Sequence, residues 1–144
     1  MKNIKNLILD MDGVLWRGET PLPGLAEFFE TLRQQSIQFV LATNNATKTP
    51  EMYVEKLARF GVGVAQDQIF TSAEATGAYV VGRYEAEAAV FVAGDVGLQE
   101  AMRRRGFRLL SVEEVLGGET AVFAVAGFNP NMEYPQLAAA SKVI

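Results

Sequence analysis

Two aspartates separated by one residue form the segment of the chain best suited to chemistry. They are Asp10 and Asp12, within the sequence LDMDGVLW at positions 9–16. In an extended chain, residues two apart point the same way, so the two carboxylates are expected to converge at the end of a strand. Carboxylates this close repel each other unless a hard divalent cation lies between them or one of them keeps a proton. The pair therefore predicts a metal site, an acid–base pair, or both.

Phosphoryl transfer is the reaction that such a pair could perform. A cation held by Asp10 could also bind a phosphate oxygen and cancel the repulsion between an anionic nucleophile and a phosphate ester. We predict that Asp10 attacks phosphorus and forms an aspartyl-phosphate. Asp12 would protonate the departing alkoxide and later deprotonate the water that breaks the intermediate.

A polar segment at the end of the next apolar run supplies groups that could hold a phosphate. Thr43 and Asn44 offer a hydroxyl and an amide to the phosphoryl oxygens, and Asn45 directly follows them. Gly13 lets the chain turn after the acids without a Cβ penalty. These four residues form the predicted phosphate-binding set. On its own, however, the Thr-Asn-Asn segment is more typical of a turn that ends a strand, and the neighbouring acids favour the phosphate-binding interpretation.

Alternating strands and helices are predicted to position these groups. Short apolar runs at 7–9 and 39–42 stop at the acids and at Thr43, as buried parallel strands with polar carboxyl ends do. Between them, Leu25, Phe28, Phe29 and Leu32 have the spacing of one apolar helix face. A right-handed crossover would bring the two strand ends to one sheet edge, where open parallel sheets bind ligands.

The same alternation continues to the last residue and predicts an α/β fold. The expected elements are a helix over 50–60, a strand at 69–70, a helix from 72 to about 83, a strand over 89–93, a helix over 98–105, strands over 107–110 and 121–126, and a final helix over 137–144. A new series of alternating strands and helices begins after residue 85, so we expect a domain boundary near residues 80–88.

Composition excludes several classes of protein. The chain has no cysteine and no histidine, which rules out disulfides, thiolate zinc sites and Ser-His-Asp hydrolysis. The formal net charge of −4 argues against a nucleic-acid partner, and no apolar run approaches the ~20 residues of a membrane span. We therefore expect a soluble, cytoplasmic protein with no nucleic-acid or membrane partner.

In this order the motifs resemble the haloacid dehalogenase (HAD) superfamily, whose first motif is D-x-D-G and whose second is a Ser or Thr ending a strand. The runs DMDGVLW at 10–16, TNN at 43–45 and TSAEAT at 71–76, with the glycines at 94, 97 and 106, are similar to its NagD-like, p-nitrophenylphosphatase branch. The resemblance implies an α/β architecture in two parts. Residues 1–82 would form the N-terminal part of a Rossmann-like HAD core, a parallel sheet flanked by helices, and residues 83–144 part of an inserted α/β cap domain.

The resemblance also implies a Mg²⁺-dependent phosphatase acting on a small phosphorylated metabolite, with Mg²⁺ held by Asp10 and Asp12, and a homodimer formed through the cap. The superfamily's third motif, a lysine, and its fourth, an acidic pair, lie beyond the cap in this branch, and neither is visible here. We therefore expect an N-terminal fragment of a longer enzyme, weakly active or inactive alone.

Other interpretations stay open. The chain could be a non-catalytic or phosphoacceptor binding domain derived from a HAD hydrolase. Asp95, after Gly94, could be the fourth motif of an enzyme without a cap. Trp16 and Arg17 could flank the site or simply pack. The arginines at 103–105, with Arg108, are expected to form a solvated face, and steering of an anionic substrate is the alternative.

Overall fold

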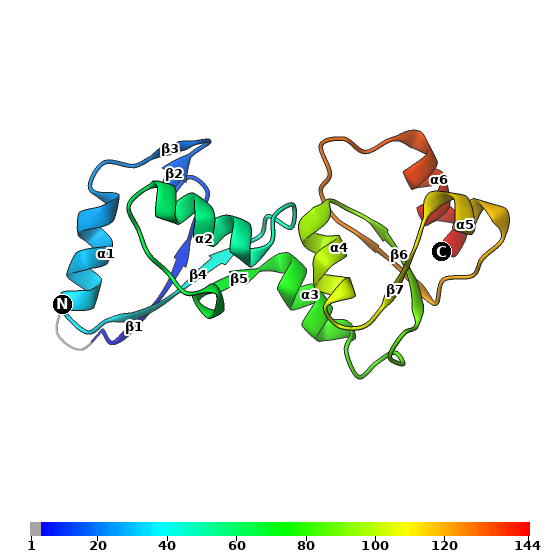
Figure 1. Cartoon of the computed structure of the whole chain (residues 1–144), viewed down its shortest axis with the longest axis horizontal. Coiled ribbons are helices and arrows are strands. Elements are labelled where there is room, and N and C mark those ends of the chain that lie inside the picture. Colours follow the sequence, from blue (N-terminus) through cyan, green and yellow to red (C-terminus); the bar gives the residue numbers. More distant parts are fainter. Residues whose placement is uncertain (1–3) are drawn as a thin grey trace. The chain divides into compact units, whose positions relative to one another are not determined.

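Helices and strands alternate along the chain in the computed structural model, which describes residues 4–144 (Figure 1). The predicted α/β class is confirmed. The elements up to residue 71 are β1 (Asn6–Asp10), β2 (Trp16–Arg17), β3 (Thr20–Pro21), α1 (Leu25–Gln34), β4 (Gln38–Thr43), α2 (Pro50–Arg59), the 3₁₀ turn η1 (Gln66–Gln68) and β5 (Ile69–Thr71). The later elements are α3 (Ser72–Val80), β6 (Ala89–Ala93), α4 (Val96–Arg103), β7 (Arg108–Leu110), α5 (Val112–Gly117), β8 (Phe123–Ala126) and α6 (Tyr134–Val143).

The chain forms two compact units. The first unit extends to Asn44 and includes Pro50–Thr71, and the second consists of Asn45–Thr49 and Ser72–Ile144. Helix α3 therefore belongs to the second unit, whereas the sequence placed it in the first. Its apolar side chains pack in the same cluster as those of α4, and Arg105, just after α4, forms an ion pair with Glu74 of α3 at 2.7 Å. The assignment of the units to a hydrolase core and a cap stays a prediction.

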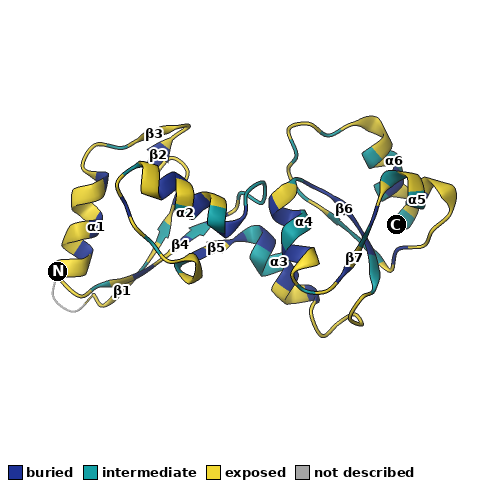
Figure 2. Ribbon diagram, in the orientation of Figure 1, coloured by how far each residue is buried: buried dark blue, intermediate teal, exposed yellow. Residues whose placement is uncertain are grey.

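The sheet of the first unit is parallel, in the order β1-β4-β5. Both crossovers move in the same direction along the sheet, so right-handed connections place α1 and α2 on one face. Residues that alternate along the strands point to that face and are buried with the helices, such as Phe39 and Leu41. Ile8, Val40 and Phe70 belong to the other face and are exposed. Figure 2 shows that α1 and α2 each carry buried as well as exposed residues. The strands are therefore parallel as predicted but buried on one face only.

A short hairpin follows β1 and was not predicted from the sequence. Strands β2 and β3 pair antiparallel, with Trp16 opposite Pro21 and Arg17 opposite Thr20. The two-residue loop begins at Gly18, whose φ of 57° suits a glycine at the first loop position. Two-residue strands are too short to show a periodic pattern, so the sequence held no strand signal here.

The second unit has its own parallel sheet, in the order β7-β6-β8. Its helix α5 was not predicted, although Ser111 and Glu114 form a capping box in which each side chain accepts a hydrogen bond from the other residue's backbone N–H. Within residues 4–144, no helix is long and apolar enough to cross a membrane.

Segment 45–49 lies directly against the start of α4 at Gly97. The backbone N–H of Gly97 donates to the carbonyl of Thr47 at 3.2 Å. A Cβ at Gly97 would lie 2.5 Å from the carbonyl oxygens of both Ala46 and Lys48. Backbone atoms cannot rotate away as a side chain can, so this close approach requires glycine.

We predict that Gly97→Ala lowers the free energy of unfolding by about 2 kcal/mol or more, because the new methyl must displace backbone. Gly117→Ala is the matched control, since Gly117 also lies in a helix and a Cβ there meets no atom within 4 Å. It should change stability by less than about 1 kcal/mol, in the stabilising direction. Urea unfolding followed by circular dichroism measures both, and equal losses would contradict the packing argument.

Candidate active site

The two candidate acids lie at the carboxyl end of β1. Asp10 is the last residue of that strand, opposite Ala42 of β4. Its Oδ1 accepts a hydrogen bond from the backbone N–H of Met11 at 2.8 Å. Asp12 follows two residues later, and both acids are exposed to solvent. A ligand in solution can therefore approach both carboxyl groups.

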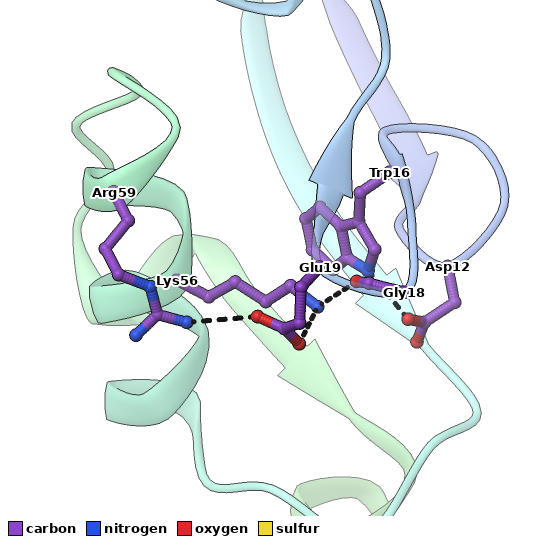
Figure 3. A network of polar contacts seen from close by, with 6 residues as sticks. All are labelled: Asp12, Trp16, Gly18, Glu19, Lys56 and Arg59. Carbon is purple, nitrogen blue, oxygen red and sulfur yellow. Dashed lines mark hydrogen bonds and ion pairs between the residues drawn. The ribbon is translucent and has the colours of Figure 1, made fainter.

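The Asp12 carboxylate accepts one hydrogen bond on each oxygen. Trp16 Nε1 donates to Oδ1 at 2.7 Å (Figure 3), and the Thr43 hydroxyl donates to Oδ2 at 3.4 Å. Thr43 is the last residue of β4, the neighbour of β1, and its side chain is nearly buried. The structure thus brings Asp12 and Thr43 together across two adjacent strand ends.

The other three predicted phosphate-binding residues differ in their settings. Gly13 has a φ of 84° and donates its N–H to the carbonyl of Trp16 at 2.8 Å, so it makes the turn expected of it. Asn44 is exposed just after β4. Asn45 belongs to the second unit, and its Oδ1 accepts hydrogen bonds from the backbone N–H and the hydroxyl of Thr47 at 3.0 and 2.8 Å. Asn45 therefore closes a local turn, and its binding of phosphate stays a prediction.

Tyr53 of α2 places a phenol beside these groups. From the sequence, Tyr53 is expected only to lie within the predicted helix over 50–60. The side chain is buried, and its hydroxyl has no hydrogen-bond partner of acceptable geometry within residues 4–144. Burial, together with the negative charge of Asp12, raises the pKa of Tyr53 to about 12, while the neighbouring Thr43 hydroxyl acts in the opposite direction. The phenol therefore stays protonated at neutral pH and is available as a donor.

Lys56 is a second residue whose position the sequence analysis missed. Its side chain is buried, and Nζ donates to the carbonyl of Gly18 at 2.7 Å and to Glu19 Oε1 at 3.0 Å (Figure 3). A signal was present, because Lys56 shares the helix face of Tyr53, Leu57 and Phe60 by its spacing. A lysine on such an apolar helix face is expected to form an ion pair or hydrogen bonds that compensate its charge.

The oxygen donors at the end of β1 suit Mg²⁺ only in part. Mg²⁺ is usually bound by one or two carboxylates, by substrate phosphate and by several waters, so the Asp10 carboxylate, together with the backbone carbonyl of Asp12, would fit such a site. The described residues contain no group of three or more acidic side chains that could hold a metal alone. Asp95 instead caps α4, where its Oδ1 accepts the N–H of Val96 at 2.7 Å, and this is a structural role.

Comparison with known proteins places the chain in a family. Residues 7–108 match the haloacid dehalogenase-like hydrolases. The chain belongs to this family. It is 29% identical to a 5′-nucleotidase of Bacillus subtilis over 96% of this chain and 51% of the relative. It is 31% identical to an acid sugar phosphatase of Staphylococcus haemolyticus over the whole of this chain and 52% of the relative.

A solved structure agrees with this family. A 4-nitrophenylphosphatase of Thermotoga maritima superposes with a TM-score of 0.80 at 33% identity, covering 95% of this chain and 49% of that one. The chain thus spans about half the length of the relatives that it matches. The resemblance to the HAD superfamily and its p-nitrophenylphosphatase branch is confirmed, and the relatives carry the names of phosphatases and a nucleotidase.

The raised pKa of Tyr53 leads to a testable dependence of stability on pH. A phenol that keeps its proton more tightly in the folded state contributes stability that is complete below pH 10.0, its ordinary pKa, and is lost as the pH rises toward about 12. We predict that this contribution amounts to at most about 3 kcal/mol.

Urea unfolding at pH 8, 10 and 11.5 measures this loss in the unchanged chain and in Tyr53→Phe. The phenylalanine variant should lose less stability over this range. Tyr134→Phe, which alters an exposed phenol in the second unit, should follow the unchanged chain. Identical pH profiles for all three proteins would show that Tyr53 does not titrate as its surroundings imply.

Proposed function

We propose that this chain contributes the nucleophile and the acid–base residue of a phosphatase that hydrolyses a small phosphate monoester. The observation that carries the proposal is the hydrogen bond between Thr43 and Asp12. It joins the ends of two adjacent parallel strands, next to Asp10, at the sheet edge where α/β proteins bind ligands. The names of the family's relatives support the same class of reaction.

The reaction would proceed in two displacements at phosphorus. A carboxylate oxygen of Asp10 attacks the phosphorus, the bond to the leaving alcohol oxygen breaks, and Asp12 gives that oxygen a proton. Asp12, now a carboxylate, then takes a proton from water as the water oxygen attacks the aspartyl-phosphate. Inorganic phosphate leaves, and both side chains return to their starting states.

The phosphoryl oxygens need donors and a counter-charge in both steps. The Asn44 amide is proposed to donate to them, and so is the Thr43 hydroxyl, whose single proton would turn from Asp12 to the bound phosphate. The backbone around Gly13 and the amide of Asn45 are further candidates. Mg²⁺ would be held by the Asp10 carboxylate and the backbone carbonyl of Asp12. When bound, it supplies positive charge that offsets the repulsion between phosphate and carboxylate.

The substrate is proposed only as a chemical class. The relatives are named for nucleotides, sugar phosphates and nitrophenyl phosphate, so their names agree on a phosphate monoester and differ on the alcohol. A net charge of −4 gives no support to a nucleic-acid partner. A homodimer formed through the second unit stays a proposal.

An assay of the full-length gene product with p-nitrophenyl phosphate and Mg²⁺ tests the function. We expect Asp10→Asn to lower kcat by about a thousandfold or more, because an amide cannot form the covalent intermediate. Removal of Mg²⁺ with a chelator should abolish turnover, and added Mg²⁺ should restore it. An Asp10→Asn variant with the wild-type rate would refute the proposal.

Binding of beryllofluoride tests whether the Asp10 carboxylate can accept a phosphoryl group. Beryllofluoride mimics a phosphoryl group on aspartate, so with Mg²⁺ the unchanged protein should bind it and Asp10→Asn should not. Binding without turnover in the full-length protein would favour a phosphoacceptor domain, and equal binding by both proteins would exclude Asp10 as the acceptor.

A further inference from the structure

The loop after Asp12 folds back on itself and brings the side chain of Trp16 into contact with Asp12. The N–H groups of Val14 and Leu15 both donate to the carbonyl of Met11, at 3.2 and 2.9 Å, and Gly13 donates to the carbonyl of Trp16 at 2.8 Å. These bonds close a tight turn between the end of β1 and the start of β2. Trp16 Nε1 is thereby placed 2.7 Å from Asp12 Oδ1.

The indole of Trp16 is completely buried and is held by side chains of α2 and the turn after it. Tyr53 stacks against it, with the ring centroids 6.2 Å apart and the planes inclined by 24°. Phe60 packs at 5.9 Å in a tilted arrangement. Lys56 Nζ lies 4.8 Å from the centroid of the indole, within the range of a cation–π contact. The ring therefore has little freedom to turn its N–H away from Asp12.

The buried lysine also ties the hairpin to α2. Besides its bonds to Gly18 and Glu19, Lys56 shares Glu19 with Arg59, whose guanidinium lies 3.4 Å from Glu19 Oε2 (Figure 3). The Lys56 ammonium thus contacts the loop of the hairpin and the face of its first residue, Trp16. The hairpin is therefore fixed to α2 by the ring contacts of Trp16 and by the polar contacts of Gly18 and Glu19.

We propose that Trp16 is a positioning residue for Asp12. Its N–H fixes Oδ1 at 2.7 Å. Oδ2, whose contact with the rotatable Thr43 hydroxyl is longer, at 3.4 Å, is then the atom that gives and takes the proton. The indole is a donor only and carries no charge, so it orients the carboxylate without competing for that proton. The part of this inference that concerns catalysis rests on the proposed function, and the part that concerns the hydrogen bond does not.

A purely structural role is the alternative. A buried indole N–H needs an acceptor, and Asp12 would then serve the packing of Trp16 rather than the reverse. The two roles differ in their effect on the leaving group. A general acid matters when the departing oxygen is a poor leaving group, as in an alkyl phosphate, and much less for p-nitrophenolate, which departs as a stable anion.

Trp16→Phe in the full-length gene product separates the two roles. The change removes the N–H and keeps an aromatic ring against Tyr53 and Lys56. We expect kcat/KM for an alkyl phosphate to fall at least about tenfold more than that for p-nitrophenyl phosphate. Tyr134→Phe, an exposed control, should leave the ratio unchanged. Equal losses on both substrates would overturn the positioning role.

A second measurement needs neither activity nor a stable Trp16 variant. Trp16 is the only tryptophan of the 144-residue chain, so its indole N–H gives one resonance in a ¹H–¹⁵N NMR spectrum. Asp12→Asn replaces a charged acceptor by a weaker neutral one and should move that indole proton upfield. Asp10→Asn, the matched control, should move it much less.

A failure of the proposed role of Trp16 can be distinguished from a failure of the proposed function. An indole resonance that does not respond to Asp12→Asn, or responds equally to both changes, would overturn the positioning of Asp12 by Trp16 whatever the enzyme assays show. Wild-type activity of Asp10→Asn would instead refute the proposed function and leave the hydrogen bond intact.

Discussion

The carboxylate of Asp12 is the point on which three parts of the first unit converge. Strand β1 leads to it, the end of β4 donates the Thr43 hydroxyl to it, and the hairpin donates the Trp16 indole N–H to it. A carboxylate can accept several hydrogen bonds, and bonds to a charged acceptor are stronger than those between neutral groups. The Asp12 carboxylate therefore adds side-chain hydrogen bonds from β4 and from the hairpin to the backbone pairing of β1 with β4.

Burial of a lysine sets the second constraint. An ammonium removed from water is costly unless its charge is compensated, and Lys56 is compensated by a carbonyl, a carboxylate and an aromatic face. A hairpin with two-residue strands has little stability of its own. Its contacts with α2 explain why it is ordered, and they also fix the ring that holds Asp12.

Much of the fold was predictable because periodicity reports burial. Three of the four residues of the predicted α1 face, at 25, 29 and 32, are buried, whereas Phe28 is exposed. The apolar runs of β1, β4 and β6 form strands as predicted, although Ile8 of β1 is exposed. The hairpin was missed because two-residue strands have no period. Helix α5 was missed although its capping box was readable. The division into units falls before α3 rather than after it, because packing against α4, and not composition, decides to which unit that helix belongs.

The sequence alone determined which chemistry was available, because the lack of histidine and cysteine and the Asp-x-Asp-Gly segment depend on residue types and local spacing. It also placed Thr43 at the strand end next to Asp12. Only the tertiary structure decided what surrounds the Asp12 carboxylate. Tyr53 and Lys56 are about forty residues away in the sequence, and contacts over such distances depend on how α2 packs on the sheet, which no local pattern encodes.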